Sequence, residues 1–163
     1  MAIPWLAVCS FCDLHSRTVP AGLTLPPLLV MIVWTAVQGS WAVSVFALIL
    51  FYLADAPRPL FSALVGSLGV LLALCWMQAG LPGVVLSLSL LGVWFAWRLG
   101  AIGGADTQVL MVLALGYGPD ILIPISVAGG FQGLIQRLRG KSSLPAMLSI
   151  LAGTGFHLLK SIF

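Results

Sequence analysis

Gly103-Gly104-Ala105-Asp106 is the stretch around which the rest of the chain is organised, because it sets a carboxylate at the start of an apolar run. The sequence contains only 4 acidic residues, and another of them, Asp13, follows the apolar run that ends at Cys12. An ionisable side chain at or inside a bilayer costs on the order of 2.5–3.5 kcal/mol, so its presence indicates a functional site. The two carboxylates are therefore the first candidates for chemistry.

Composition predicts the class of protein. Of the 163 residues, 61% are hydrophobic and 7% are charged, whereas soluble domains contain about 25% charged residues. The expected fold is all-α, a polytopic transmembrane helix bundle that forms a single integral-membrane domain over residues 1–163. The net charge of +3 agrees with the cationic bias of cytoplasmic loops, and nothing in the sequence indicates nucleic-acid binding. No Lys or Arg precedes the first apolar run, so we expect no cleaved signal peptide.

Apolar runs separated by short polar segments predict about eight helices, with six as the alternative count. The first run, residues 1–12, is only about 18 Å long as a helix, against a hydrocarbon core of about 30 Å. Pro20, Pro26 and Pro27 are expected at or near the start of the second helix. The later runs cover residues 25–37, 41–53, 60–77, 84–97, 109–117, 121–135 and 144–159.

The basic residues follow an asymmetric pattern along these runs. If every run crosses the membrane, the loops on the side opposite Asp13 contain no Lys or Arg, and the exception, Lys160, is near the C-terminus. The positive-inside rule then places Asp13 at the cytoplasmic face. The cations on the same side as Asp13 are Arg17, Arg58, Arg98, Arg137, Arg139 and Lys141.

The number of crossings decides whether the two carboxylates can meet. Four predicted crossings separate Asp13 from Asp106, so both are expected at the cytoplasmic face. A single long helix over residues 25–53 would instead put them on opposite sides of the membrane.

Two Asp side chains within a few ångströms cannot both ionise easily, so one holds a proton while the other stays charged. This arrangement suits peptide hydrolysis, in which the charged Asp activates a water and the protonated one polarises the scissile carbonyl. Glycines ahead of Asp106 would let a substrate backbone approach closely. A lone carboxylate at a helix start is also a common cap, and this interpretation of Asp106 stays open.

The two Asp-centred motifs together resemble the type IV prepilin peptidase family, intramembrane aspartyl proteases of the G-x-G-D type. The similarity covers roughly residues 12–29 and 99–160, where a proline near the start of the last helix also matches. It implies that Asp13 and Asp106 are catalytic and that no metal or other cofactor is needed. The residues that it places near the substrate are Gly103, Gly104, Ala105 and Pro145.

The resemblance implies cleavage of basic leader peptides from prepilin-like proteins, whose hydrophobic N-terminal helix follows the cleavage point. Such enzymes lie in the cytoplasmic membrane of prokaryotes and act at its cytoplasmic face in pilus assembly and protein secretion. Bifunctional members also carry a cytoplasmic domain with paired Cys motifs for N-methylation. We find no such domain, so we expect a peptidase only, similar to the small Tad-type or archaeal members. The sequence does not indicate an oligomeric state.

The sequence departs from the family pattern at three positions. Ala105 replaces the usual second Gly, Gln108 a usual Lys, and Ala21 a usual Asn. A non-catalytic homologue that binds prepilins is therefore an alternative. A small membrane transporter is another, because transporters also contain intramembrane acids and broken helices.

The other polar residues have ordinary interpretations. His15 and Arg17 are expected in a cytoplasmic loop, Asp55 and Asp120 in loops or turns, and His157 as a packed polar residue. The C-x-x-C formed by Cys9 and Cys12 has no second pair and no neighbouring His. We therefore expect these thiols to pack as small hydrophobic groups and to bind no metal.

Overall fold

The computed structural model describes the backbone of residues 2–16, 18–53, 58–138 and 146–162, and their side chains except those of 58–64, 133–138 and 161–162. The described chain is helical and contains no strand, which confirms the all-α expectation. Its elements are α1 (Ala2–Ser16), α2 (Ala21–Val37), α3 (Trp41–Tyr52), α4 (Arg58–Arg98), α5 (Gly104–Tyr117), the 3₁₀ turn η1 (Pro119–Ile121), α6 (Leu122–Leu138) and α7 (Ala146–Ile162).

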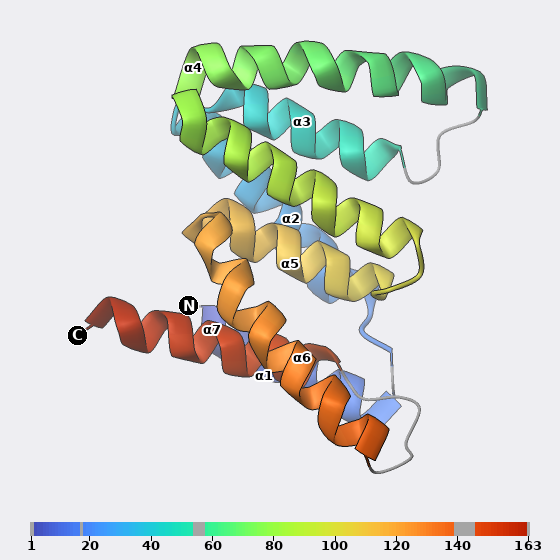
Figure 1. Ribbon diagram of the computed structural model, residues 1–163, viewed down its shortest axis with the longest axis vertical. Coiled ribbons are helices and arrows are strands. Elements are labelled where there is room, and N and C mark those ends of the chain that lie inside the picture. Colours follow the sequence, from blue (N-terminus) through green and yellow to red (C-terminus); the bar gives the residue numbers. More distant parts are fainter. Residues whose placement is uncertain (1, 17, 54–57, 139–145, 163) are drawn as a thin grey trace.

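Helix α4 covers two of the predicted apolar runs, because the polar segment between them is reduced to a sharp bend. Gly80 takes a left-handed conformation at the bend, with φ 62° and ψ −151°. The two parts of α4 then run back along each other (Figure 1). Gly83 allows this close approach, since a Cβ there would lie 2.7 Å from the Cβ of Ala79.

The starts and ends of α1 and α2 differ from the expectation. α1 continues to Ser16, so Asp13 lies within the last turns of the helix and not after it. α2 begins directly after Pro20, and Leu23 N–H donates to the Pro20 carbonyl at 2.9 Å. Pro26 and Pro27 therefore lie inside α2, whereas the sequence analysis expected them at or near its start.

Helices α2 and α3 are separate, since Gln38–Ser40 joins them in a turn closed by backbone hydrogen bonds from Gly39 to Ala36 and from Ser40 to Thr35. The alternative of one long helix over residues 25–53 is therefore wrong. An even number of helical passes, counting both parts of α4, lies between Asp13 and Asp106.

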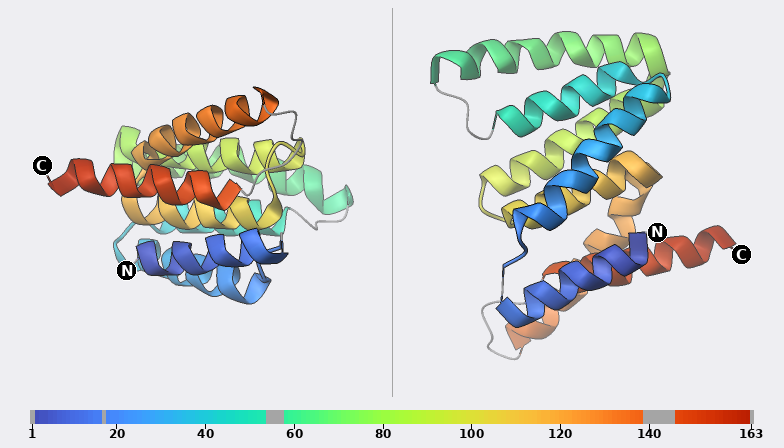
Figure 2. Two further views of the ribbon diagram at one scale, coloured as in Figure 1. Left: turned by 90° about the horizontal axis from the view of Figure 1, so that it is seen from below. Right: turned by 180° about the vertical axis from the view of Figure 1, so that it is seen from behind.

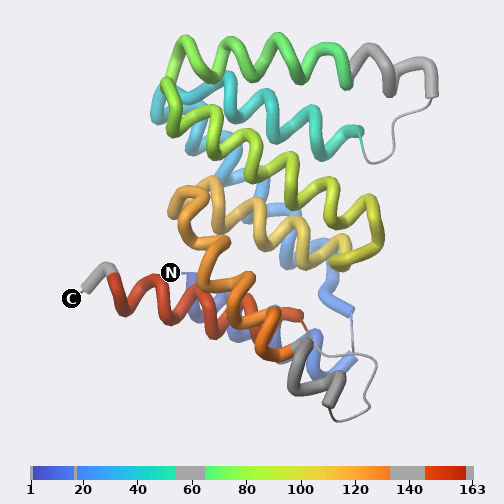
Figure 3. The backbone as a smooth tube through the Cα atoms, in the orientation of Figure 1, coloured from blue at the N-terminus to red at the C-terminus, as the bar shows by residue number. Residues whose placement is uncertain are grey.

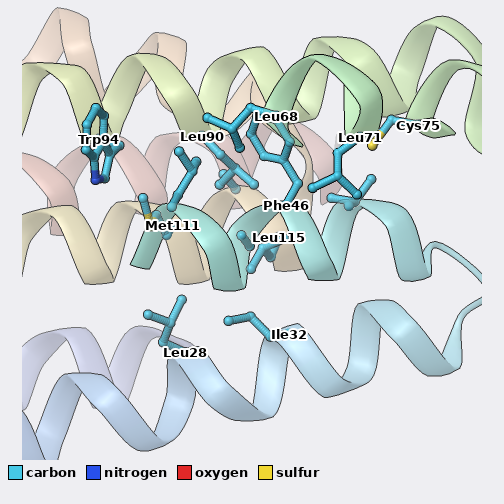
Figure 4. Packing of buried hydrophobic residues seen from close by; sticks show 14 of the residues in the cluster. Leu28, Ile32, Phe46, Leu68, Leu71, Cys75, Leu90, Trp94, Met111 and Leu115 are labelled. Atoms are coloured by element: carbon cyan, nitrogen blue, oxygen red, sulfur yellow. The ribbon is translucent and has the colours of Figure 1, made fainter. Parts of the chain in front are cut away.

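Helix α5 is the centre of the molecule, because it packs on both sides (Figure 3). One core forms between α2, α3, α4 and α5 around the fully buried Phe46, with Leu90 and Met111 nearby (Figure 4). A second core forms between α1, α5, α6 and α7 around Leu6 and Leu113. Asp106, at the start of α5, therefore lies where the two halves meet.

The ends of the described helices fall at two ends of the bundle (Figures 1 and 2). One end gathers the last residues of α1, α3, α6 and the second part of α4, together with the first residues of α2, α4, α5 and α7. We call it the carboxylate end, because it contains both Asp13 and Asp106. The bend at Gly80, the start of α1 and the end of α7 lie at the opposite end.

The outer surface exposes many large apolar side chains. They occur on every described helix from α1 to α7. The most exposed of these side chains include Met77 (80%), Val37 (74%), Leu99 (70%) and Phe11 (69%).

By length and composition, one helix of the described chain, Val65–Arg98, is long and apolar enough to cross a membrane. That helix alone is weak evidence for a membrane protein, because core helices of soluble proteins pass the same test. The chain also reverses within it at Gly80. Shorter apolar helices cover Ala21–Val37, Trp41–Tyr52 and Ala146–Lys160.

Candidate active site

The turn between α4 and α5 sets the position of Asp106. Gly100 has a φ of 73°, a left-handed conformation that glycine adopts without steric cost. Its N–H donates to the Trp97 carbonyl at 2.8 Å, and the Ala101 N–H donates to the Ala96 carbonyl at 2.9 Å, which closes the end of α4. The chain then enters α5 at Gly104, and Asp106 falls in the first turn.

The Asp106 carboxylate folds back over the residue that precedes α5. It accepts a hydrogen bond from the backbone N–H of Gly103, one of the N–H groups that a helix start leaves unpaired. A Cβ at Gly103 would lie 3.0 Å from Asp106 Oδ2. Asp106 thus caps α5, as one of the two sequence interpretations proposed, and this bond fixes the direction of its side chain.

Asp13 is held at the carboxylate end by contacts of α1 with two neighbours. Ser10, one turn earlier, donates its hydroxyl to the Met147 carbonyl of α7 at 3.2 Å in a buried position. Trp5 Nε1 donates to the Leu23 carbonyl of α2 at 2.9 Å. These bonds fix the rotation of α1 about its axis, because residues three apart share a helix face.

The two carboxyl groups lie close enough to interact. The negative charge of Asp13 acts directly on the Asp106 carboxyl, and both residues are half-buried. Oδ2 of Asp13 is buried and has no hydrogen-bond partner among the described residues. A buried carboxylate oxygen without a donor is costly, so a water or a substrate N–H at this position would relieve the cost.

Asp106 also lines a cavity of about 400 Å³ between α5, α6 and α7. Its walls combine apolar side chains with small residues and a few polar groups. The lining residues are Ala101, Ile102, Asp106, Leu110, Ile125, Ser126, Gly129, Gln132, Ala146, Ser149 and Ile150.

The residues that the resemblance placed near the substrate lie in different surroundings. Gly103 contacts the Asp106 carboxylate, whereas Gly104 faces the indole nitrogen of Trp97. Ala105 packs against the core of α1, α6 and α7. Pro145 lies outside the described residues. Among these positions, only Gly103 makes a described contact with a candidate catalytic side chain.

Gln108 has a partner that the sequence did not suggest. The Thr24 hydroxyl of α2 donates to Gln108 Oε1, which ties the start of α2 to the start of α5. Thr24 is fully buried. Gln108 and Asp106 line different cavities. Gln108, which replaces the lysine of the prepilin peptidase pattern, therefore lies outside the Asp106 cavity.

Sequence reasoning missed Ser10 and Thr24 as positioning residues. A hydroxyl inside an apolar run gives no sign of which helix it will meet, because both bonds join segments that are distant in sequence. The role of Gly100 in ending α4 was weakly indicated by the sequence, since glycine is common after a helix end.

The remaining polar candidates make ordinary contacts. The exposed His15 stacks on Phe11 with ring centroids 6.1 Å apart, and His157 meets Tyr117 edge-on at 6.5 Å. Asp120 lies in η1, at the opposite end of the bundle from Asp106. Arg17 and Asp55 lie outside the described residues, as do Arg139 and Lys141 of the basic loop.

The cysteines form no metal site in the described part of the chain. Cys9, Cys12 and Cys75 are free thiols there, and no group of three or more His, Cys, Asp or Glu residues could hold a metal ion.

Comparison with known proteins gives no relative: no family model, no curated protein and no solved structure matches the chain. The resemblance to prepilin peptidases therefore depends on the two Asp motifs themselves.

Proposed function

We propose that this chain is an intramembrane aspartyl endopeptidase that removes basic leader peptides from prepilin-like proteins. The observation that carries the proposal is the interaction of Asp13 with Asp106, which come from α1 and α5. Two carboxyl groups that share one proton supply both the base and the acid of peptide hydrolysis. The cavity beside Asp106 offers room for the peptide.

The reaction divides between the two residues. The charged carboxylate takes a proton from a water, which attacks the scissile carbonyl carbon. The protonated carboxyl donates a hydrogen bond to the carbonyl oxygen as negative charge develops there. Proton transfer to the leaving nitrogen then breaks the peptide bond. The two carboxyl groups share one proton, so one member of the pair serves as the base while the other serves as the acid.

The membrane placement is part of the proposal. It is supported by the 7% charged residues of the sequence and by the exposed apolar side chains of the helices. We propose eight crossings, in which the two parts of α4 count separately, with the carboxylate end at the cytoplasmic face. Arg98, at the end of α4, then lies on the cytoplasmic side, as the positive-inside rule requires.

Cleavage of a co-expressed prepilin-like substrate, scored by gel shift, tests the proposal. Asp13→Asn and Asp106→Asn keep the size of each side chain but remove the ionisable group. We expect each variant to lose at least about 100-fold in cleavage rate. Asp120→Asn is the matched control, because Asp120 lies at the opposite end, and it should cut like the wild type.

The alternatives give different results in the same experiment. An Asn variant that still cuts while inserting normally would disprove the paired mechanism. A wild type that cuts no leader, with pilus assembly intact in both Asn variants, would favour a prepilin-binding homologue. An ion dependence that persists without any peptide would favour a transporter.

A further inference from the structure

A second cavity lies on the other side of α5 from the Asp106 cavity, with a volume of about 190 Å³. It forms where the end of α3 and the end of α4 meet the starts of α2 and α5, so it belongs to the carboxylate end. Its walls are mainly apolar, and the residues that matter here are Leu50, Trp94, Trp97, Gln108 and Met111. The proposed peptidase reaction makes no use of this cavity.

Two indole groups line this cavity, and the N–H of one of them is buried without an acceptor among the described residues. Trp94 is only 7% exposed, and its buried Nε1 has no hydrogen-bond partner among the described residues. Figure 4 shows its nitrogen edge turned toward α5, where Met111 lies. Nε1 of Trp97 lies beside Gly104, 3.4 Å from where a Cβ would be. A buried donor without an acceptor is unfavourable, so an occupant with an acceptor oxygen would relieve this cost.

A cation follows the cavity-lining Trp97 at the end of α4. Arg98 follows Trp97 directly and is one helical turn beyond Trp94, so the three side chains share one part of the α4 surface. Arg98 is exposed, and it makes no ion pair within the described part of the chain. Along α4, from the end of the bundle inward, a cation is thus followed by two indole groups that line the cavity, whose other walls are mainly apolar.

We propose that this cavity, together with Arg98 next to it on α4, binds an anionic glycerophospholipid of the cytoplasmic leaflet. Such a lipid carries a phosphate, ester carbonyls and an acyl chain in the order in which Arg98, the two indoles and the apolar side chains Leu50 and Met111 follow one another. A peptide also has carbonyl oxygens but carries no anion in a fixed relation to an apolar chain. The inference rests on the membrane placement proposed above, and it does not depend on the Asp chemistry.

Retention of lipid by the purified full-length chain tests the proposal. The protein in detergent is offered equal amounts of phosphatidylglycerol and phosphatidylcholine with identical acyl chains, and bound lipid is counted by native mass spectrometry. We expect the wild type to retain about fivefold more phosphatidylglycerol, the preference that one interfacial cation provides. Arg98→Gln should remove this preference.

Substitution of Trp by Phe tests the contribution of each indole N–H group, because Phe keeps an apolar ring but has no N–H donor. Trp94→Phe and Trp97→Phe should each lower phosphatidylglycerol retention about 3- to 10-fold, as expected for loss of one hydrogen bond. Trp76→Phe is the control, because Trp76 is 58% exposed and lies near the bend at Gly80. Its retention should equal that of the wild type. Trp94→Phe should also unfold at no lower temperature than the wild type without lipid, since it removes an unpaired donor.

Several outcomes would overturn the lipid site. They are equal retention of both lipids by the wild type, an equal loss in Trp76→Phe, displacement of the lipid by a prepilin-like peptide, and recovery of the chain without a membrane or detergent. Asp13→Asn and Asp106→Asn should retain lipid like the wild type. Failure of cleavage with lipid retention intact would therefore count against the peptidase alone.

Discussion

At the scale of single residues, Asp106 serves two purposes that the sequence had presented as alternatives. Its carboxylate caps α5 through the Gly103 N–H and also interacts with Asp13. Both Asp residues could be identified from the sequence, because acids are costly and rare in so apolar a chain. Ser10 and Thr24 could not, because their importance arises only when α1 meets α7 and α2 meets α5.

Gly103→Ala should impair cleavage without unfolding the protein. Gly103 has φ −74° and ψ 158°, which any residue adopts, so the backbone tolerates alanine. The new Cβ would lie 3.0 Å from Asp106 Oδ2, closer than a normal contact, and would push the carboxylate aside. We expect a roughly 10-fold slower cleavage, since small displacements of reacting groups are costly.

Gly69→Ala is the control for this substitution, because a Cβ at Gly69 meets nothing within 4 Å. Initial cleavage rates and thermal unfolding of both variants give the comparison. A wild-type rate for Gly103→Ala would mean that the carboxylate position is not set by the glycine.

At the scale of elements, most polar breaks between apolar runs coincide with breaks between helices, but the break at residues 78–83 is a bend within α4. The bend at Gly80 was harder to place, since Gln78, Gly80, Pro82 and Gly83 all lie in one apparent loop and only Gly80 takes a positive φ. The sequence did not predict which helices contact each other. Gly153 and Gly155 look equivalent in it, yet only Gly153 faces another backbone.

Gly153→Ala should destabilise the packing of α6 on α7. A Cβ at Gly153 would lie 2.5 Å from the Ile125 Cα, and a backbone cannot move aside as a side chain can. We expect a loss of about 1–3 kcal/mol in the free energy of unfolding, as for other overpacked sites. Gly155→Ala meets nothing within 4 Å and should be neutral or slightly stabilising.

Thermal unfolding in detergent compares the two α7 variants under identical conditions. Cleavage should fall with stability in Gly153→Ala, because α7 holds α1 and hence Asp13 through the bond from Ser10 to Met147. Equal melting temperatures for Gly153→Ala and Gly155→Ala would contradict the close approach of the two helices.

At the scale of the whole molecule, the helices are short for membrane segments. α3 has 12 residues and α5 has 14, which is about 18 and 21 Å at 1.5 Å per residue, against a hydrocarbon core of about 30 Å. A short hydrophobic segment thins the bilayer around it or draws flanking residues toward the interface. The proposed placement thus brings the lipid headgroups close to Asp13 and Asp106, where a leader peptide and water can reach both.

The proposed orientation predicts which helix ends face the cytoplasm. In a chain whose three native cysteines are replaced by serine, Gln38→Cys marks the exposed turn between α2 and α3, and Leu99→Cys marks the carboxylate end. We expect a membrane-impermeant maleimide to label Gln38→Cys in intact cells and Leu99→Cys only after the membrane is opened. The cysteine-free chain, which should not be labelled, is the control. Labelling of both positions in intact cells, or the reverse order, would contradict the cytoplasmic placement of the Asp pair, because Leu99 and Asp106 lie at the same end of the bundle.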